Sequence, residues 1–131
     1  MVARGARRPR SRFGPALDLF TSGVAHIALH ANRDLHTLSA FDTTRARPEL
    51  AESLDRFAAA SALGEACVRF ANADDTGSVH AAATALLDAL CSAPGDAVAG
   101  ITLAGLWRVV AELGFAPSLE ACASCHASEF A

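Results

Sequence analysis

Two cysteines near the C-terminus, Cys122 and Cys125, have the spacing of a metal-ligand pair. Thiolates two residues apart in a tight loop can both reach one Zn²⁺ ion at about 2.3 Å. A structural zinc site needs four ligands, and the chain holds no second Cys-x-x-Cys pair. His126 is a possible third ligand, but its adjacency to Cys125 makes the geometry awkward. We therefore expect half of a zinc site, with zinc held weakly or not at all.

The same segment, Cys122-Ala-Ser-Cys125-His126, also fits the C-x-x-C-H motif of c-type haem attachment. Haem attachment follows export, and we find neither a signal-peptide pattern nor a methionine other than Met1 as an axial ligand. A thioredoxin-like redox pair would follow a strand, whereas a predicted helix end and Pro117 precede this pair. We rank zinc first, haem second and a redox pair third, with two incidental thiols as the remaining interpretation.

Arginines are concentrated at the start of the chain. Five of the 11 positive residues are Arg4, Arg7, Arg8, Arg10 and Arg12, and no carboxylate precedes Asp18. From residue 48 onward, three arginines face eleven acidic residues, so the net charge of -3 hides a basic head on an acidic body. Guanidinium groups bind phosphate oxygens in bidentate pairs, which gives salt-dependent affinity without sequence readout. A solvated terminus with an accidental charge run is an equally good interpretation of composition alone.

Other histidine motifs are weaker. His26-x-x-x-His30 has the spacing of half a zincin motif, but Ile27 stands where the catalytic glutamate would be. The segment also has the pattern of a strand, so we expect a solvent-facing pair of histidines. A zinc deaminase would need His-x-Glu, which His26, His30, His36 and His80 do not provide. We therefore expect no catalytic site and no enzymatic activity.

The elements that position these residues follow from hydrophobic spacing. Residues 16–42 predict a β-hairpin, with turn residues Asn32-Arg33-Asp34 between two apolar runs. A helix is predicted to begin at Pro48, with an apolar stripe formed by Leu50, Leu54, Phe57, Ala60, Leu63, Cys67 and Phe70.

Two further helices are predicted. Ser78 can cap the first of them, which Pro94-Gly95 ends; Gly114, in a left-handed conformation, ends the other before Pro117. We expect Trp107 on the third helix to lie in the core. No apolar stretch reaches the length of a membrane span, so we expect a cytoplasmic protein.

The ordered set of these parts resembles the RecO family of bacterial recombination mediators. The resemblance begins at Val2-Ala-Arg-Gly-Ala-Arg-Arg8 and continues through Gly14-Pro-Ala-Leu-Asp-Leu-Phe20 and the hairpin with Asp34-Leu-His-Thr-Leu38. It ends with Leu106-Trp-Arg-Val-Val-Ala-Glu-Leu-Gly-Phe-Ala-Pro117 and the cysteine pair. No single motif is specific to the family, but their order is.

The resemblance implies a DNA-binding OB barrel followed by a helical domain with a four-cysteine zinc knuckle. It places Arg4, Arg7, Arg8, Arg10 and Arg12 on a DNA-facing loop and makes Cys122 and Cys125 the first zinc pair. It implies a bacterial, nucleoid-associated protein that binds single- and double-stranded DNA. It also implies action with RecR to displace single-strand-binding protein so that RecA can load. His126 departs from the family, which usually has glycine there. The first barrel strands, the second cysteine pair and the C-terminal helices are also missing, so we expect an internal portion of a RecO protein.

These observations predict an α+β chain with three parts. Residues 1–47 form a partial OB-type region of about three strands in an open barrel, residues 48–117 a domain of about three helices, and residues 118–131 an incomplete zinc-knuckle tail. The predicted function is that of a RecO-like mediator in DNA repair. The alternative is a helical protein-interaction module with a passive basic tail, and a small haem or redox protein ranks below both.

Overall fold

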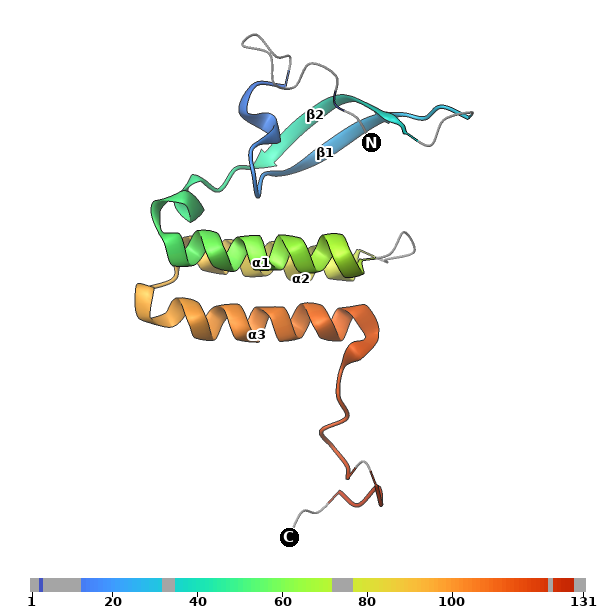
Figure 1. Ribbon diagram of the computed structural model, residues 1–131, viewed down its shortest axis with the longest axis vertical. Coiled ribbons are helices and arrows are strands. Elements are labelled where there is room, and N and C mark those ends of the chain that lie inside the picture. The colour runs from blue at the N-terminus through green and yellow to red at the C-terminus, as the bar shows by residue number, and fades with distance from the viewer. Residues whose placement is uncertain (1–2, 4–12, 32–34, 72–76, 123, 129–131) are drawn as a thin grey trace. The chain divides into compact units, whose positions relative to one another are not determined.

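The chain divides into two units, Met1–Ser53 and Leu54–Ala131, which are considered separately (Figure 1). The computed structural model describes residues 3, 13–31, 35–71, 77–122 and 124–128. The first unit contains a two-stranded sheet and the second contains three α-helices. The α+β class predicted from the sequence is therefore confirmed, whereas the three predicted domain ranges stay predictions.

The first unit is built on an antiparallel hairpin of β1 (Ser22–Ala28) and β2 (Thr37–Arg45). The register pairs Ser22 with Arg45 at one end and Ala28 with Thr37 at the other, with irregularities at Ser22/Gly23 and His26/Ile27. The hairpin prediction is confirmed, although a short 3₁₀ helix, η1 (Gly14–Leu17), precedes the strands and lies against β2. The predicted turn residues 32–34 lie outside the described part of the chain.

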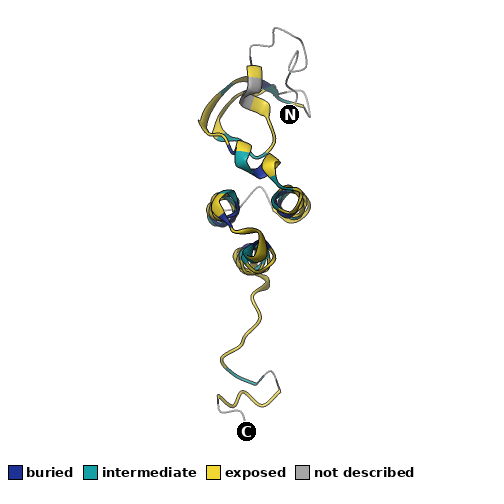
Figure 2. Cartoon of the chain, turned by 90° about the vertical axis from the view of Figure 1, so that its left-hand side faces the viewer, coloured by how far each residue is buried: buried dark blue, intermediate teal, exposed yellow. Residues whose placement is uncertain are grey.

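Both faces of this hairpin are largely exposed, as the yellow colour of the strands in Figure 2 shows. In β1, Val24 is 55% exposed and Ile27 is 45% exposed, while Leu38 in β2 is buried. Two strands lie among the described residues, and residues 1–2 and 4–12 lie outside them, so the predicted count of about three strands stays a prediction. The OB-type barrel therefore stays a prediction.

The predicted first helix is interrupted. A 3₁₀ helix, η2 (Pro48–Glu52), has Pro48 at its start, and the α-helix α1 (Leu54–Phe70) begins only after Ser53. Ser53 is extended, with φ -137° and ψ 131°, the conformation of a residue that precedes a helix. Leu50 and Phe70 therefore belong to different elements and cannot share one continuous apolar stripe.

The second unit packs α1, α2 (Ser78–Ser92) and α3 (Val98–Val110) against one another, with α1 and α3 running in the same direction (Figure 1). Its most deeply buried side chains are Ala60, Leu63, Leu90 and Val109. Arg56 on α1 donates a hydrogen bond from Nη2 to the carbonyl of Ala93, just beyond α2, at 2.7 Å. Three helices were predicted, and this prediction is confirmed.

Helix ends follow the sequence signals in part. Gly77, in a left-handed conformation, precedes α2, so Ser78 is its first residue rather than its cap. A short 3₁₀ turn, η3 (Gly95–Ala97), follows Pro94 and leads into α3. A π-helical segment, η4 (Ala111–Phe115), continues α3, and Gly114 has φ 88°, as predicted for a left-handed helix stop.

The exposure of α3 corrects two expectations. Trp107 is 56% exposed rather than part of the core. The stretch Gly95–Phe115 also has the length and composition of a membrane span, with a mean hydropathy of 1.4, so the expectation that no stretch reaches that length was wrong. One such helix is weak evidence for a span, because a core helix of a soluble protein passes the same test. Only 11% of the 18-residue apolar window in this stretch is buried, so much of its apolar surface is uncovered.

Candidate nucleic-acid interface and cysteine loop

One arginine of the first unit has a structural role. Arg47 is only 4% exposed, and its Nη1 donates hydrogen bonds to the carbonyl of Phe20 at 2.7 Å and to Oγ of Ser22 at 2.8 Å. These bonds tie the chain after β2 to the segment that enters β1. The buried Arg47 guanidinium therefore supports the hairpin, while Arg45 is exposed. No sequence pattern distinguishes the buried Arg47 from the exposed Arg45, so the structural role of Arg47 was not predicted.

The predicted DNA-binding arginines, Arg4, Arg7, Arg8, Arg10 and Arg12, lie outside the described residues. The residue that follows them, Phe13, is only 4% exposed. Gly14 comes next with φ 48° and begins η1, which lies against β2. The arginine-rich segment is therefore attached to the first unit through a buried aromatic side chain.

Polar side chains pair across the exposed hairpin. His26 Nε2 lies 2.7 Å from Asp42 Oδ2, and both side chains are more than half exposed. His30 lies beyond the end of β1, where its backbone N–H donates to Nδ1 of His36 at 3.3 Å. His26 and His30 therefore do not share one strand face, contrary to the expected pair. The carboxylate of Asp42 therefore places a negative charge beside His26 on this part of the hairpin.

The cysteine segment forms a closed loop around Cys122. The backbone N–H of Cys122 donates to the carbonyl of Ala127 at 2.8 Å, and the backbone N–H of His126 donates to the carbonyl of Cys122 at 2.9 Å. Backbone hydrogen bonds from Cys125 and Ser124, followed by a side-chain hydrogen bond from Cys125, lower the pKa of the Cys122 thiol. Donors directed at sulfur favour the thiolate, the form that binds metal.

This loop fits one half of a tetrahedral thiolate site. Cys122 and Cys125 come together in a tight turn, and the loop stabilises a thiolate at Cys122. Among the described residues, no group of three or more His, Cys, Asp or Glu side chains could hold a metal ion. Cys122 and Cys125 are therefore two candidate ligands, and the remaining ligands of a structural site would have to come from elsewhere.

Comparison with known proteins shows the family. The family model of the C-terminal part of recombination protein O matches residues 51–131, more than half of the chain. The chain belongs to the RecO family. The matched residues include all three α-helices and the cysteine loop.

A curated relative supports the same family over a longer stretch. The DNA repair protein RecO of Gloeobacter violaceus (strain ATCC 29082 / PCC 7421) is 28% identical over 126 residues, covering 95% of this chain. The alignment covers 48% of the relative, so the chain spans about half the length of that RecO protein. No solved structure matches the chain.

The RecO resemblance implies a glycine at the position of His126. Its φ is 58°, a left-handed conformation that glycine adopts freely and other residues adopt at a cost of about 1–2 kcal/mol. The turn that closes the loop thus gives a physical reason for glycine at this position. His126 is exposed, so its side chain adds no packing that would offset this cost.

Proposed function

We propose that this chain binds single- and double-stranded DNA through its basic head, as part of a RecO-type recombination mediator. The observation that supports the proposal is that the chain belongs to a DNA repair family and has five arginines before Phe13. Arginine side chains grip phosphate oxygens whatever the base sequence. A mediator that acts on many DNA sequences needs such non-specific contacts.

Charge distribution within the chain favours the head as the site of contact. In the second unit, Arg56 is partly buried and donates to the Ala93 carbonyl, while Arg69 is ion-paired to Glu65 at 2.7 Å. In the first unit, the buried Arg47 supports the hairpin. These arginines already make hydrogen bonds or an ion pair within the fold. The basic head is the largest concentration of positive charge in the sequence.

We further propose that Cys122 and Cys125 are the first two ligands of a zinc knuckle, and that the helices dock protein partners. Zinc would link the loop to two further ligands and fix the end of the chain. The partners implied by the family resemblance are RecR and single-strand-binding protein, with RecA loading as the outcome. No catalytic step is proposed for any of these residues.

Salt-dependent DNA binding tests this proposal. If Arg7, Arg8, Arg10 and Arg12 engage about four phosphates, the log–log slope of affinity against salt should be near -3 for single-stranded DNA. Replacing these four arginines by alanine should remove most of that slope. Fluorescence anisotropy with a labelled oligonucleotide at several salt concentrations measures both quantities.

A charge-matched control separates the head from overall charge. The variant Arg7→Ala/Arg8→Ala and the variant Arg69→Ala/Arg108→Ala lose the same charge, but the second pair is exposed on the helical unit. Only the first variant should weaken DNA binding strongly. If the quadruple head variant binds DNA like the parent chain, the head is a passive tail and the helical interaction module becomes the better assignment.

A further inference from the structure

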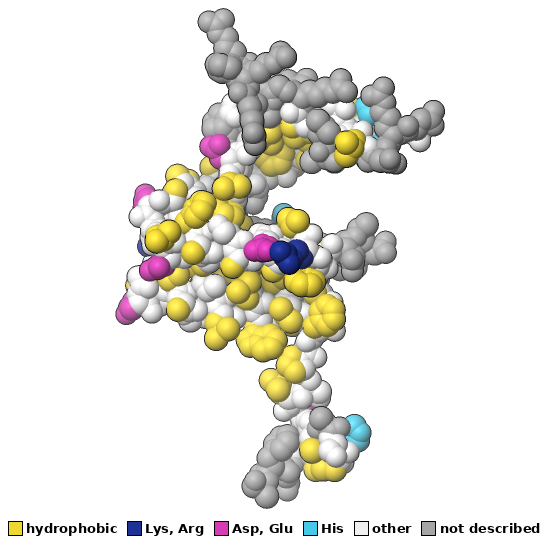
Figure 3. Space-filling model, in the orientation of Figure 1, with side chains coloured by type: hydrophobic (Ala, Val, Ile, Leu, Met, Phe, Trp, Pro, Cys, Tyr) yellow, Lys and Arg dark blue, Asp and Glu magenta, His cyan; other side chains and the backbone are white. Residues whose placement is uncertain are grey.

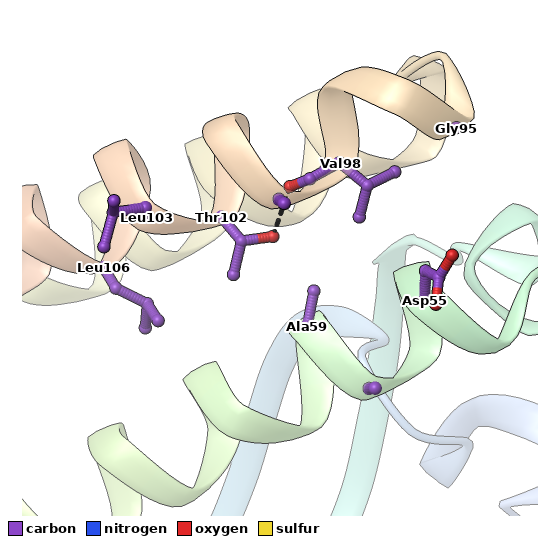
Figure 4. A pocket seen from close by; sticks show the side chains of 9 residues that line it. Asp55, Ala59, Gly95, Val98, Thr102, Leu103 and Leu106 are labelled. Atoms are coloured by element: carbon purple, nitrogen blue, oxygen red, sulfur yellow. Dashed lines mark hydrogen bonds between the residues drawn. The ribbon is translucent and has the colours of Figure 1, made fainter.

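The second unit offers few contacts to a phosphate backbone. Figure 3 shows mainly hydrophobic side chains over the helices on the face it presents, with acidic side chains and little Lys or Arg among them. A groove of about 580 Å³ lies between α1 and α3 (Figure 4), and Asp55 is the one charged residue among the described residues that line it. A carboxylate there repels phosphate. The DNA contacts proposed above therefore depend on the first unit, and on what holds the attachment point of its basic head.

The segment that joins the basic head to β1 is anchored at both of its ends. Phe13, which follows the head, is only 4% exposed, and η1 after it lies against β2. At the other end, Arg47 Nη1 donates hydrogen bonds to the carbonyl of Phe20 at 2.7 Å and to Oγ of Ser22 at 2.8 Å. Thr44 Oγ1 donates a further hydrogen bond to the carbonyl of Ser22 at 3.2 Å. Contacts with β2, and with the arginine that follows it, thus hold the segment.

The backbone of Phe20 is strained. Its φ is 63°, a left-handed conformation in which the Cβ atom is crowded against the following carbonyl. Such a conformation persists where neighbouring contacts impose it, and it is concentrated at functional positions. The N–H of Thr21 donates to the carbonyl of Asp18 at 3.3 Å, which closes a turn at this point. Arg47 holds the Phe20 carbonyl from outside that turn, so the bend at Phe20 depends on Arg47.

We infer that Arg47 is a positioning residue for DNA binding. Through the bend at Phe20 it fixes the segment that carries the basic head, and so reduces the conformational freedom that is lost when the head binds. Arg47 is itself only 4% exposed, so its guanidinium acts within the first unit rather than on a phosphate. The inference rests on the proposed DNA binding by the head, and it adds a residue on which the affinity of that binding depends.

Fluorescence anisotropy of the full chain with a labelled single-stranded oligonucleotide tests the inference. Arg47→Ala should weaken binding about fivefold or more, because several side chains of the head must then be ordered on binding. The slope of log affinity against log salt should stay the same, whereas loss of a phosphate-contacting arginine lowers its magnitude by about 0.7. Arg45→Ala is the matched control, because Arg45 carries the same charge at an exposed position, and it should weaken binding far less. A slope lowered by Arg47→Ala would make Arg47 a phosphate ligand and overturn the inference.

Two double-mutant cycles separate positioning from a general loss of stability. In the Arg7→Ala/Arg8→Ala background, Arg47→Ala should weaken binding about twofold or less, because fewer contacts of the head remain to be positioned. In the Phe20→Gly background its effect should also shrink, because glycine adopts the left-handed conformation without strain. Amide chemical shifts of β1 and β2 check that the hairpin remains folded in each variant.

The outcomes distinguish this inference from the proposed function. If Arg7→Ala/Arg8→Ala binds DNA like the parent chain, the proposed function fails and the inference fails with it. If that variant loses affinity but Arg47→Ala does not, or if Arg47→Ala has the same effect in all three backgrounds, binding by the head stands and the positioning role is refuted. Ser22→Ala, which removes one acceptor of Arg47 and keeps every charge, takes the place of Arg47→Ala if the hairpin unfolds. It should weaken binding with the slope unchanged, and an affinity equal to that of the parent would likewise refute the role.

Discussion

Gly105 on α3 lies directly against the side chain of Leu86 on α2. A Cβ atom at position 105 would meet Leu86 Cδ1, and would lie 2.7 Å from Cδ2 and 2.8 Å from Cγ. Leu86 is only 4% exposed, so its side chain has little room to move away. The two helices therefore depend on glycine for their close approach.

Gly105→Ala should destabilise the helical unit. Overpacking of a well-packed contact costs about 1–3 kcal/mol, while the better helix propensity of alanine returns about 1 kcal/mol at most. Gly100→Ala is the matched control on the same helix, because a Cβ atom there meets nothing within 4 Å. It should stabilise the unit by about 0.5–1 kcal/mol. Urea denaturation followed by circular dichroism measures both, and equal effects of the two substitutions would contradict the close contact.

The sequence predicted the hairpin and the helices, but it did not predict which of their faces other elements cover. The hairpin and three helices follow from local spacing, and the left-handed Gly114 follows from its place before Phe115 and Pro117. Trp107 was assigned to the core because it lies on an apolar helix face, yet it is 56% exposed. Periodicity identifies the apolar face of a helix, but it does not show whether a neighbouring element packs there.

The candidate site shows the same limit. The cysteine spacing identified the Cys122–Cys125 loop, but the amide donors that lower the pKa of Cys122 come from backbone geometry alone. The role of Arg47 was not predictable, because its hydrogen-bond partners Phe20 and Ser22 are more than twenty residues away in sequence. Contacts of this kind depend on the strand register, which only the folded hairpin defines.

Arg47→Ala should destabilise the first unit. The substitution removes two hydrogen bonds from a charged donor, each worth about 1.5–3 kcal/mol, and leaves the carbonyl of Phe20 without that donor. Arg45→Ala removes the same charge from an exposed position and should reduce stability less than Arg47→Ala does. Chemical shifts of the hairpin amides in the two variants check this. Similar spectral changes in both variants would mean that charge, rather than the buried contacts of Arg47, determines the stability of the first unit.

Cys122 should react as a thiolate at lower pH than an ordinary cysteine. The hydrogen bonds from Cys125 and Ser124 lower its pKa, so this contribution to loop stability is present above the pKa of the unfolded chain and is lost as the pH falls through the folded-state pKa. The rate of alkylation against pH, with chelator present, should rise earlier for Cys122 in the folded chain than for Cys122 in the urea-unfolded chain. Mass spectrometry of the labelled peptides locates the reaction. Parallel pH profiles of Cys122 in the two states would exclude the proposed donors.

Zinc content should be below one ion per chain. The proposed site has two cysteine ligands, no group of three or more possible ligands lies among the described residues, and most of the binding energy of such a site depends on completing four. Mild chelation should remove the metal, unless two chains share one ion. Elemental analysis of the purified chain, beside a Cys122→Ser/Cys125→Ser variant, measures the content. One tightly held zinc ion per chain would show that other residues also bind the metal, and His126 would be the first of them to replace by alanine.

Hydrogen exchange should divide the chain between its two units. Leu63, Leu90 and Val109 are almost fully buried in the helical unit, whereas β1 contains no buried residue among Ser22–Ala28. A two-stranded hairpin with both faces in water is marginal, because little apolar area offsets the cost of ordering it. Amides within α1 and α3 should therefore exchange at least about tenfold more slowly than those of β1 and β2. Equal protection would contradict this expectation, and would mean that the hairpin is covered by further structure, as a closed OB-type barrel requires.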